Sequence, residues 1–184
     1  MDRDERTLVD GALRDPAAFG EIVDRHKAMV YSVAYNFFGN RSVAEDIAQD
    51  AYLELYRNLH KIESDLHLTF WLRQTVTRKC IDWTRRLKHR RHQPIEDAPE
   101  PSFHPAPRDP ILAEELDRMV GLLPEKMRLV VILRFQEDLK LSEIGEVLDM
   151  PVNTVKTTLR RALERLRPKA AHLGQEALYE AVRA

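Results

Sequence analysis

A stretch near the C-terminal end, residues 141–167, constrains the fold of this chain more than any other part of its sequence. It reads as a helix, a tight turn and a second helix. Ser142 is suited to cap the first helix, because its hydroxyl can accept a hydrogen bond from an N–H of the first turn. Pro151 breaks the run within residues 149–153, since proline is tolerated only in a first helical turn. Apolar residues then recur at helical spacing, namely Val155, Leu159, Ala162, Leu163 and Leu166.

The opposite face of this second helix is basic. Its residues are Lys156, Thr157, Arg160, Arg161, Arg165 and Arg167. A short turn followed by a helix that is basic on one side is typical of a helix-turn-helix whose second helix enters the major groove of DNA. The alternative is a solvated basic helix in an ordinary bundle, and the short turn favours the DNA-binding interpretation.

Charge is segregated along the chain, although 29 Lys and Arg against 30 Asp and Glu give a formal net charge of −1. Residues 71–92 carry eight basic side chains against one acid, and residues 151–169 carry six against one. Between them, residues 93–117 carry seven acids against one Arg. Two basic segments separated by an acidic one predict two nucleic-acid contacts joined by a linker.

The composition argues against several other classes of protein. Cys80 is the single cysteine, so an internal disulfide or a cysteine-cluster metal site is excluded, and its apolar surroundings predict a reduced core residue. The chain has no run of 18 apolar residues and no hydrophobic signal segment, so we expect a cytoplasmic protein. The seven histidines form no i, i+4 ligand pair. We therefore expect no metal, no cofactor, no small-molecule substrate and no enzyme activity.

The N-terminal part predicts three helices. After a polar lead, apolar residues recur at helical spacing over residues 16–38, and Gly39-Asn40 ends that helix. Ser42 and Glu45 form a capping box that predicts the start of the second helix. Its predicted buried stripe is Ile47, Ala48, Ala51, Tyr52, Leu55 and Leu59, and its predicted outer face is Glu45, Asp46, Gln49, Asp50 and Glu54.

The third helix is expected to begin near Thr69, after a loop at residues 60–68, and to run into a basic cluster at residues 85–92. Trp71 and Trp83 on this helix are either core anchors or platforms for nucleic-acid bases, and the residues alone leave both open. A basic helix that carries aromatic residues suits single-stranded DNA, where bases stack on side chains and positive charge follows the backbone.

The predicted fold class is all-α, because the chain has no alternating strand segments and only six glycines. Residues 94–110 hold six prolines, several acids and little apolar material, which predicts a flexible Pro-rich acidic linker. Further helices are expected from Asp109-Pro110 and from Leu123-Pro124. The predicted division is a small helical domain at 1–93, the linker at 94–110, a second small helical domain with the helix-turn-helix at 111–170, and a C-terminal extension of unknown role at 171–184.

Three motifs, in this order and spacing, resemble one protein family. They are Ala44–Tyr52 (AEDIAQDAY), Phe70-Trp71-Leu72 with Ile81-Asp82 after it, and the run from Leu123-Pro124-Glu125-Lys126 to Leu166. On these residues the chain resembles an extracytoplasmic-function (ECF) sigma factor of bacterial RNA polymerase over roughly residues 10–170.

The resemblance implies a role for each domain. The first is similar to sigma region 2, which grips the clamp of the largest polymerase subunit and melts the −10 promoter element. The second is similar to sigma region 4, which reads the −35 element and sits on the polymerase flap, while the linker would thread toward the RNA exit path. Such factors carry no catalytic residues, and an anti-sigma factor, often membrane-bound, usually holds them inactive.

Three sets of site residues follow from these patterns and from the resemblance. The −35 set is Lys156, Thr157, Arg160, Arg161 and Arg165. The −10 set is Lys61, Leu68, Trp71, Arg73, Arg78, Arg85 and Arg86. The core-polymerase set is Asp46, Gln49 and Asp50.

The chain departs from the family pattern at four positions. Arg78 stands where members usually have Asn, Leu68 replaces a frequent aromatic residue, Asn153 replaces a frequent Gly, and Thr158 replaces a frequent Arg. These positions fall on base-reading surfaces, so the family does not predict the promoter sequence. The competing hypothesis is a stand-alone helix-turn-helix regulator, which would need a dimerising surface and usually a sensor domain, and the sequence indicates neither.

Overall fold

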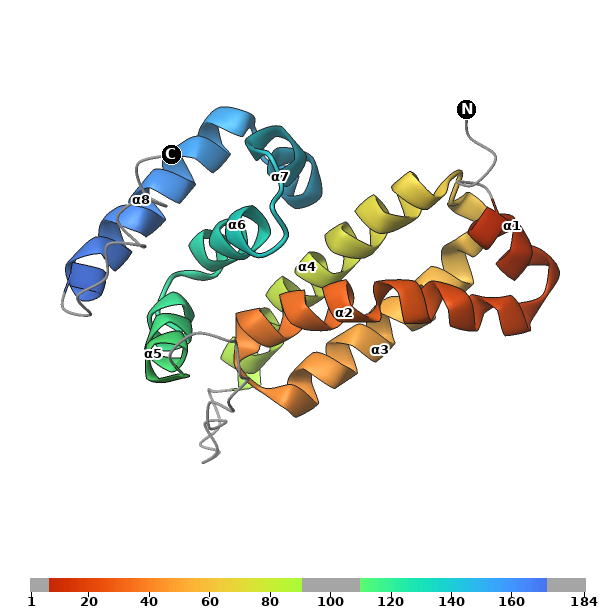
Figure 1. The fold of residues 1–184 in the computed structure, drawn as a ribbon, viewed down its shortest axis with the longest axis horizontal. Helices are drawn as coiled ribbons and strands as arrows, with labels where there is room; N and C mark the ends of the chain where they lie inside the picture. The colour runs from red at the N-terminus through yellow and green to blue at the C-terminus, as the bar shows by residue number, and fades with distance from the viewer. Residues whose placement is uncertain (1–6, 91–109, 172–184) are drawn as a thin grey trace. The chain divides into compact units, whose positions relative to one another are not determined.

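The computed structural model describes residues 7–90 and 110–171, and every regular element within these ranges is a helix (Figure 1). The chain divides into two compact units, one of residues 1–35 and 41–98 and the other of residues 36–40 and 99–184. The predicted all-α class with two small helical units is therefore confirmed. The predicted linker and C-terminal extension lie outside the described residues, except for Pro110 and Ala171 at the ends of described helices.

The N-terminal segment, expected only as a polar lead, forms a helix. This helix, α1, spans Thr7–Arg14, and its residues Leu8, Val9 and Ala12 are buried. A short 3₁₀ helix, η1, follows at Pro16–Ala18, where the N–H of Ala17 donates to Asp15 Oδ1 at 2.9 Å. Three apolar residues are enough to give α1 one buried side, because α4 lies against it.

Helices α2 (Phe19–Phe38) and α3 (Arg41–Asn58) are joined through Gly39, whose φ of 63° is one that residues with a side chain rarely adopt. The predicted end of the helix at Gly39-Asn40 is confirmed. The predicted capping box is wrong, since α3 begins at Arg41 and Ser42 lies inside its first turn. Glu45 instead pairs with Arg41, with 2.8 Å between Oε1 and Nε.

The loop expected at residues 60–68 is much shorter. A 3₁₀ helix, η2, spans Leu59–Lys61, and α4 spans Asp65–Arg90. Ser64 explains the early start of α4, because its Oγ accepts a hydrogen bond from the N–H of His67 at 3.1 Å, as an N-cap residue does. Leu68 consequently lies within the helix and is fully buried.

The core of the first unit is built on two apolar stripes. Helix α4 supplies a ladder at every fourth position, Leu68, Leu72, Val76 and Cys80, each 0% exposed. Helix α3 packs against α4 and supplies Ala44, Ile47, Ala51 and Leu55. The predictions of a helical stripe on α3 and of a core position for Cys80 are confirmed. Ala48 and Tyr52, expected in the stripe, are only half-buried.

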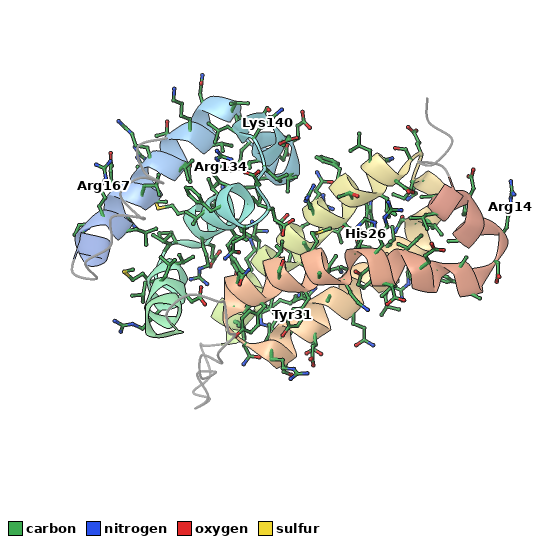
Figure 2. The ribbon with its side chains drawn as sticks, in the orientation of Figure 1. Arg14, His26, Tyr31, Arg134, Lys140 and Arg167 are labelled. Carbon is green, nitrogen blue, oxygen red and sulfur yellow. The ribbon has the colours of Figure 1, made fainter. Side chains whose placement is uncertain are left out.

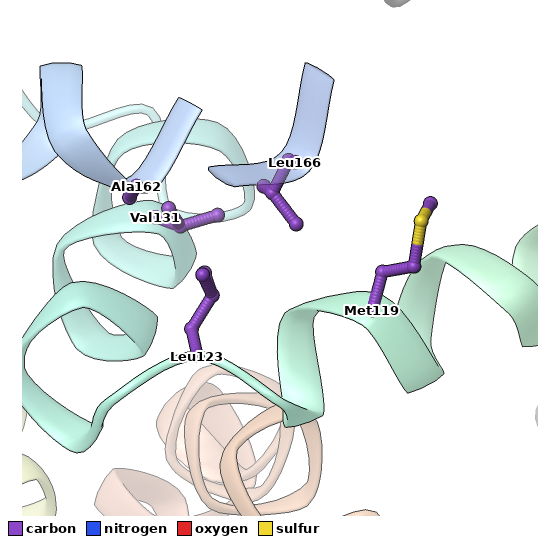
Figure 3. Close-up of a cluster of buried hydrophobic side chains, with 5 residues drawn as sticks. All are labelled: Met119, Leu123, Val131, Ala162 and Leu166. Carbon is purple, nitrogen blue, oxygen red and sulfur yellow. The ribbon is translucent and has the colours of Figure 1, made fainter. Parts of the chain in front are cut away.

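The second unit consists of α5 (Pro110–Gly121), α6 (Glu125–Phe135), α7 (Leu141–Leu148) and α8 (Val152–Ala171). The starts expected after Asp109-Pro110 and Leu123-Pro124 are confirmed. Helix α6 is central, since its residues Leu129–Leu133 are all buried and it packs against the other three helices. Figure 3 shows five side chains of one buried cluster of this core, contributed by α5, the α5–α6 connection, α6 and α8: Met119, Leu123, Val131, Ala162 and Leu166.

Candidate nucleic-acid and protein interfaces

The turn between α7 and α8 is held by close backbone contacts. Asp149 adopts the left-handed conformation, with φ 52° and ψ 53°, and the N–H of Met150 donates to the carbonyl of Gly145 at 2.8 Å. Gly145 is buried beneath this turn, and a Cβ added to it would lie 2.7 Å from the carbonyl oxygen of Met150. The carbonyl of Pro151 accepts hydrogen bonds from two N–H groups in the first turn of α8, at 2.8 and 3.0 Å. Residues 141–167 thus form the expected helix-turn-helix.

The first helix of this motif begins differently from the prediction. Lys140 is the N-cap residue of α7, so Ser142 lies in the first turn and does not cap it. The backbone N–H of Lys140 donates to Glu143 Oε2 at 2.6 Å, and a charged acceptor makes this bond stronger than one to a serine hydroxyl. Just before α7, Asp138 in the α6–α7 connection accepts a hydrogen bond at its Oδ1 from Arg134 of α6, at 3.3 Å. Figure 2 shows Arg134 on α6 and Lys140 at the start of α7.

Helix α8 has one buried side and one exposed, basic side. Val155, Ala162 and Leu166 are buried, and Leu159 and Leu163 are half-buried. Four of the five residues predicted for the −35 element are exposed: Lys156, Arg160, Arg161 and Arg165.

Two contacts modify this basic face. Thr157 is half-buried, and its hydroxyl donates to the carbonyl of Asn153 at 2.9 Å, so it is partly engaged with its own helix. Arg160 Nε lies 3.8 Å from Glu164 Oε1. A pair of exposed charges contributes little to stability, so the guanidinium of Arg160 can turn toward another partner at small cost.

Four of the residues predicted for the −10 element lie along one side of α4 or next to it. Trp71, Arg78 and Arg85 follow at intervals of seven residues, which brings them to one side of a helix. Arg86 lies next to this side, and all three arginines are exposed, whereas Trp71 is half-buried. A half-buried indole is anchored in the fold and still presents part of its ring to the surface.

The other three residues of the −10 set lie elsewhere. Arg73 is five residues before Arg78, about 140° around the helix. Burial lowers the pKa of His26 on α2 (Figure 2), and the positive charges of Arg25 and Arg73 lower it further. Lys61 is exposed, with its Nζ 2.8 Å from Asn58 Oδ1. Leu68 is 0% exposed and belongs to the core. We therefore leave Leu68 out of the DNA surface proposed below, because its side chain cannot reach a base.

The three residues predicted to contact core polymerase share the outer side of α3. Asp46, Gln49 and Asp50 are all exposed, and their spacing of three and four residues places them on one face. Leu53, which the sequence analysis did not single out, continues this face and is 49% exposed. An amphipathic surface of this kind, acidic with an apolar residue, suits a basic protein partner.

A hollow between α3 and α4 brings two of the predicted sets together. Asp50 from the polymerase set and Arg78 and Arg86 from the −10 set all line it. Glu54 and Lys79 join the two helices beside them, with 2.8 Å between Oε2 and Nζ. Side chains expected to meet protein and side chains expected to meet DNA are thus neighbours within the first unit.

The −35 set predicted from the sequence omits the residues at the very start of α8, although the resemblance placed Asn153 on a base-reading surface. Val152, Asn153 and Thr154 are exposed, and Val152 is 46% exposed although it is apolar. The N-terminal residues of a recognition helix are the ones that contact base edges. Their position directly after Pro151 is the sequence signal that identifies them, whereas the predicted set contains mostly basic residues and begins at Lys156.

Two negative findings apply to the described ranges. None of the helices within residues 7–90 and 110–171 combines the length and the apolar character needed to cross a membrane. In the same residues, His, Cys, Asp and Glu side chains do not gather in threes where they could hold a metal ion.

Family models match both units of the chain. The model of Sigma-70 region 2 matches residues 22–90, and that of Sigma-70, region 4 matches residues 113–166. The ECF RNA polymerase sigma factor SigW of Bacillus subtilis is 33% identical over 172 residues, covering 86% of this chain and 92% of SigW. The ECF RNA polymerase sigma factor SigE of Mycolicibacterium smegmatis is 30% identical over 185 residues, covering 92% of this chain and 69% of SigE.

Two solved structures share the fold. The sigma factor RpoE, in complex with the anti-sigma factor NepR from Bartonella quintana, superposes with a TM-score of 0.69 at 18% identity and covers 82% of this chain and 94% of its own. CnrH, in complex with the cytosolic domain of CnrY, superposes with a TM-score of 0.65 at 21% identity and covers 91% of this chain and 97% of its own.

A two-unit helical chain with regions 2 and 4 of the sigma-70 class is a sigma factor of bacterial RNA polymerase. Within that class, this chain belongs to the ECF sigma factors. It directs core polymerase to specific promoters, and the hypothesis of a stand-alone regulator is not favoured. Sigma factors are initiation factors without catalytic activity of their own.

Proposed function

We propose that the exposed basic side of α8 reads the −35 element, that α4 with Lys61 engages the melted −10 element, and that the outer side of α3 docks on core polymerase. For this function we propose the division expected from the sequence: 1–93 for core and −10 binding, 94–110 as linker, 111–170 for −35 binding and 171–184 as an extension of unassigned role. The observation that carries this proposal is the exposure of Lys156, Arg160, Arg161 and Arg165 on a helix held by a rigid turn.

The partners proposed for this chain are promoter DNA, the clamp and flap of core polymerase, and an anti-sigma factor. The two structures of similar fold were solved with the anti-sigma factor NepR and with the cytosolic domain of CnrY. We extend that mode of regulation to this chain, with an inhibitor that is either soluble or membrane-bound. Because its partners work on the chromosome, the chain acts in the cytoplasm, and it has no catalytic role and needs no cofactor.

A gel-shift experiment with and without core polymerase tests this function. The probe is a set of duplexes selected from a randomised promoter library by the chain together with core polymerase. We expect sequence-specific binding that requires core polymerase. Tight, sequence-specific binding by the chain alone, as a dimer, would instead support the stand-alone regulator.

The −35 assignment predicts different effects for two kinds of contact. Arg160→Ala or Arg161→Ala should cost about 1–3 kcal/mol of discrimination at a guanine, because Arg can pair bidentately with its O6 and N7. Lys156→Ala and Arg165→Ala should weaken all promoters alike and lower the salt slope by about one. Binding of a panel of −35 mutant promoters at several salt concentrations measures both. The assignment is wrong if both Arg160→Ala and Arg161→Ala leave the panel ranked and bound as before.

The −10 assignment predicts a base preference that depends on Arg78. Extruding a base costs a few kcal/mol, which stacking and edge contacts in the receiving surface must offset. Arg78 is exposed on the same side of α4 as Trp71, so we expect selection from a randomised −10 library to give one motif with Arg78 and another with Arg78→Asn. Identical motifs would mean that Arg78 contacts only phosphate. Arg85→Asn serves as control, since it removes a neighbouring charge from the same side of α4.

The polymerase assignment predicts slower association when the acidic face of α3 is neutralised. Asp46→Ala/Asp50→Ala should lower the association rate with core polymerase by about tenfold at low salt, because complementary charge mainly sets the rate of encounter. Glu21→Ala/Asp24→Ala on α2 is the matched control, since it removes the same charge from exposed positions. Stopped-flow fluorescence measures the rate, and circular dichroism verifies the helices. A folded Asp46→Ala/Asp50→Ala variant that binds as fast as the control removes this face from the interface.

A further inference from the structure

The first turn of α8 presents two side chains whose chemistry the arginines lack. Val152 is apolar and 46% exposed, and the neighbouring Asn153 carries an exposed amide. One apolar residue at a surface is ordinary by itself. These two residues are candidates for base contact because they lie at the start of the helix proposed to enter the major groove.

Asn153 is aligned with Arg160 on the outward side of α8. Seven residues correspond to about 20° less than two full turns, and they advance about 10.5 Å along the axis. That length equals about three base-pair steps of 3.4 Å. Asn153 and Arg160 therefore form one column, with Lys156 and Thr157 between them, and this column can follow successive base pairs.

The start of α8 is also held rigidly. The Met150 N–H bond to the Gly145 carbonyl and the bonds to the Pro151 carbonyl hold the turn from which Val152 emerges. One side of Val152 rests on this turn, since its Cγ2 would lie 3.6 Å from a Cβ added to Gly145. Its other side faces solvent. Side chains on such a supported element meet a ligand with little loss of freedom.

The chemistry of the pair matches one base pair. Asn can bond bidentately to N6 and N7 of adenine, and apolar side chains contact the C5-methyl group of thymine, both in the major groove. We propose that Val152 and Asn153 read an A·T pair of the −35 element, about three base-pair steps from the base read by Arg160. This proposal rests on the proposed role of α8, and it adds specificity residues outside the arginine set.

Modified bases test the proposal without disturbing the protein fold. The holoenzyme is bound to its selected promoter duplex in which each −35 thymine in turn is replaced by deoxyuridine, which lacks only the methyl group. We expect a three- to fivefold loss of affinity, on the order of one buried methyl group, at a single thymine. Val152→Ala should abolish that loss, whereas Leu122→Ala, which truncates another exposed apolar residue of the second unit, should retain it.

The paired adenine gives a second readout. Replacing it by 7-deazaadenine removes N7 and should weaken binding by roughly fivefold or more with Asn153, and not with Asn153→Ala. If no thymine responds to deoxyuridine, or if Val152→Ala responds as the parent does, the proposal is overturned. Failure of the underlying function would look different, because binding would then be indifferent to the whole −35 sequence.

Discussion

Gly145→Ala is expected to lower the free energy of unfolding of the second unit by about 1–3 kcal/mol, the usual cost of inserting atoms into a filled space. The added Cβ would lie 2.7 Å from the carbonyl oxygen of Met150, which is backbone and cannot rotate away. Relief requires the α7–α8 turn to shift, and α8 would shift with it. Binding of the holoenzyme to −35 DNA should therefore fall more than tenfold, even at temperatures where the variant stays folded.

The expected loss of stability is opposite in sign to the usual effect of replacing glycine by alanine in a helix. Alanine normally stabilises a helix by up to about 1 kcal/mol relative to glycine. Gly121→Ala, at an exposed position of the same unit with open space around its Cβ, is the matched control and should be neutral or stabilising. Hydrogen exchange of the α7 and α8 amides reports on this unit alone, since two units can unfold separately. Equal exchange rates in Gly145→Ala and Gly121→Ala would contradict the predicted clash.

Leu68→Ala is expected to destabilise the first unit by about 2–5 kcal/mol, because it opens a cavity in a core whose side chains are fully packed. Leu68 is 0% exposed at one end of the apolar ladder of α4. Thermal unfolding of the first unit, followed by hydrogen exchange in α4, measures the loss. Leu66→Ala is the control, since Leu66 is 72% exposed two residues earlier and should change stability by less than about 0.5 kcal/mol.

The same pair of variants decides between two roles for Leu68. A residue that lined a base pocket would be needed for −10 binding and dispensable for stability. A core residue is needed for stability, and its truncation should lower the stability of the unit without a separate loss of −10 binding by the molecules that remain folded. A Leu68→Ala variant as stable as Leu66→Ala, yet impaired at −10 DNA, would return Leu68 to the DNA surface.

Helical periodicity accounts for most of what could be predicted before the structure. The stripe of Val155, Ala162 and Leu166 repeats at the helical period, and such a pattern has one stable solution, with that side buried. The breaks at Gly39 and Pro151 were equally readable, because a left-handed φ and a missing N–H restrict the backbone locally. Because the apolar side of α8 is buried, the side chains on its opposite side are necessarily exposed.

Helix starts were predicted less well, because several residues compete to cap one helix. Ser142 and Ser42 are good capping residues, yet their helices begin before them. The carboxylate of Glu143 accepts a hydrogen bond from the backbone N–H of Lys140. Ser64 caps α4 at a place where the sequence shows no helical periodicity. Which competitor prevails depends on how the helix is seated on its neighbours, and local sequence does not encode that.

The sequence by itself determined that this chain is all-α, that α8 has a basic side opposite an apolar one, and that its motifs are those of an ECF sigma factor. These properties reside in the spacing of side chains along one helix, which is a local quantity. Only the tertiary structure decided that Leu68 is core, that Arg73 of α4 lies near His26 of α2, and that Gly145 must lack a side chain. Each of these depends on which atoms from a distant part of the chain, or from across a turn, occupy the neighbouring space. Because protein interiors are closely packed, these neighbouring atoms decide which side chains fit at each position.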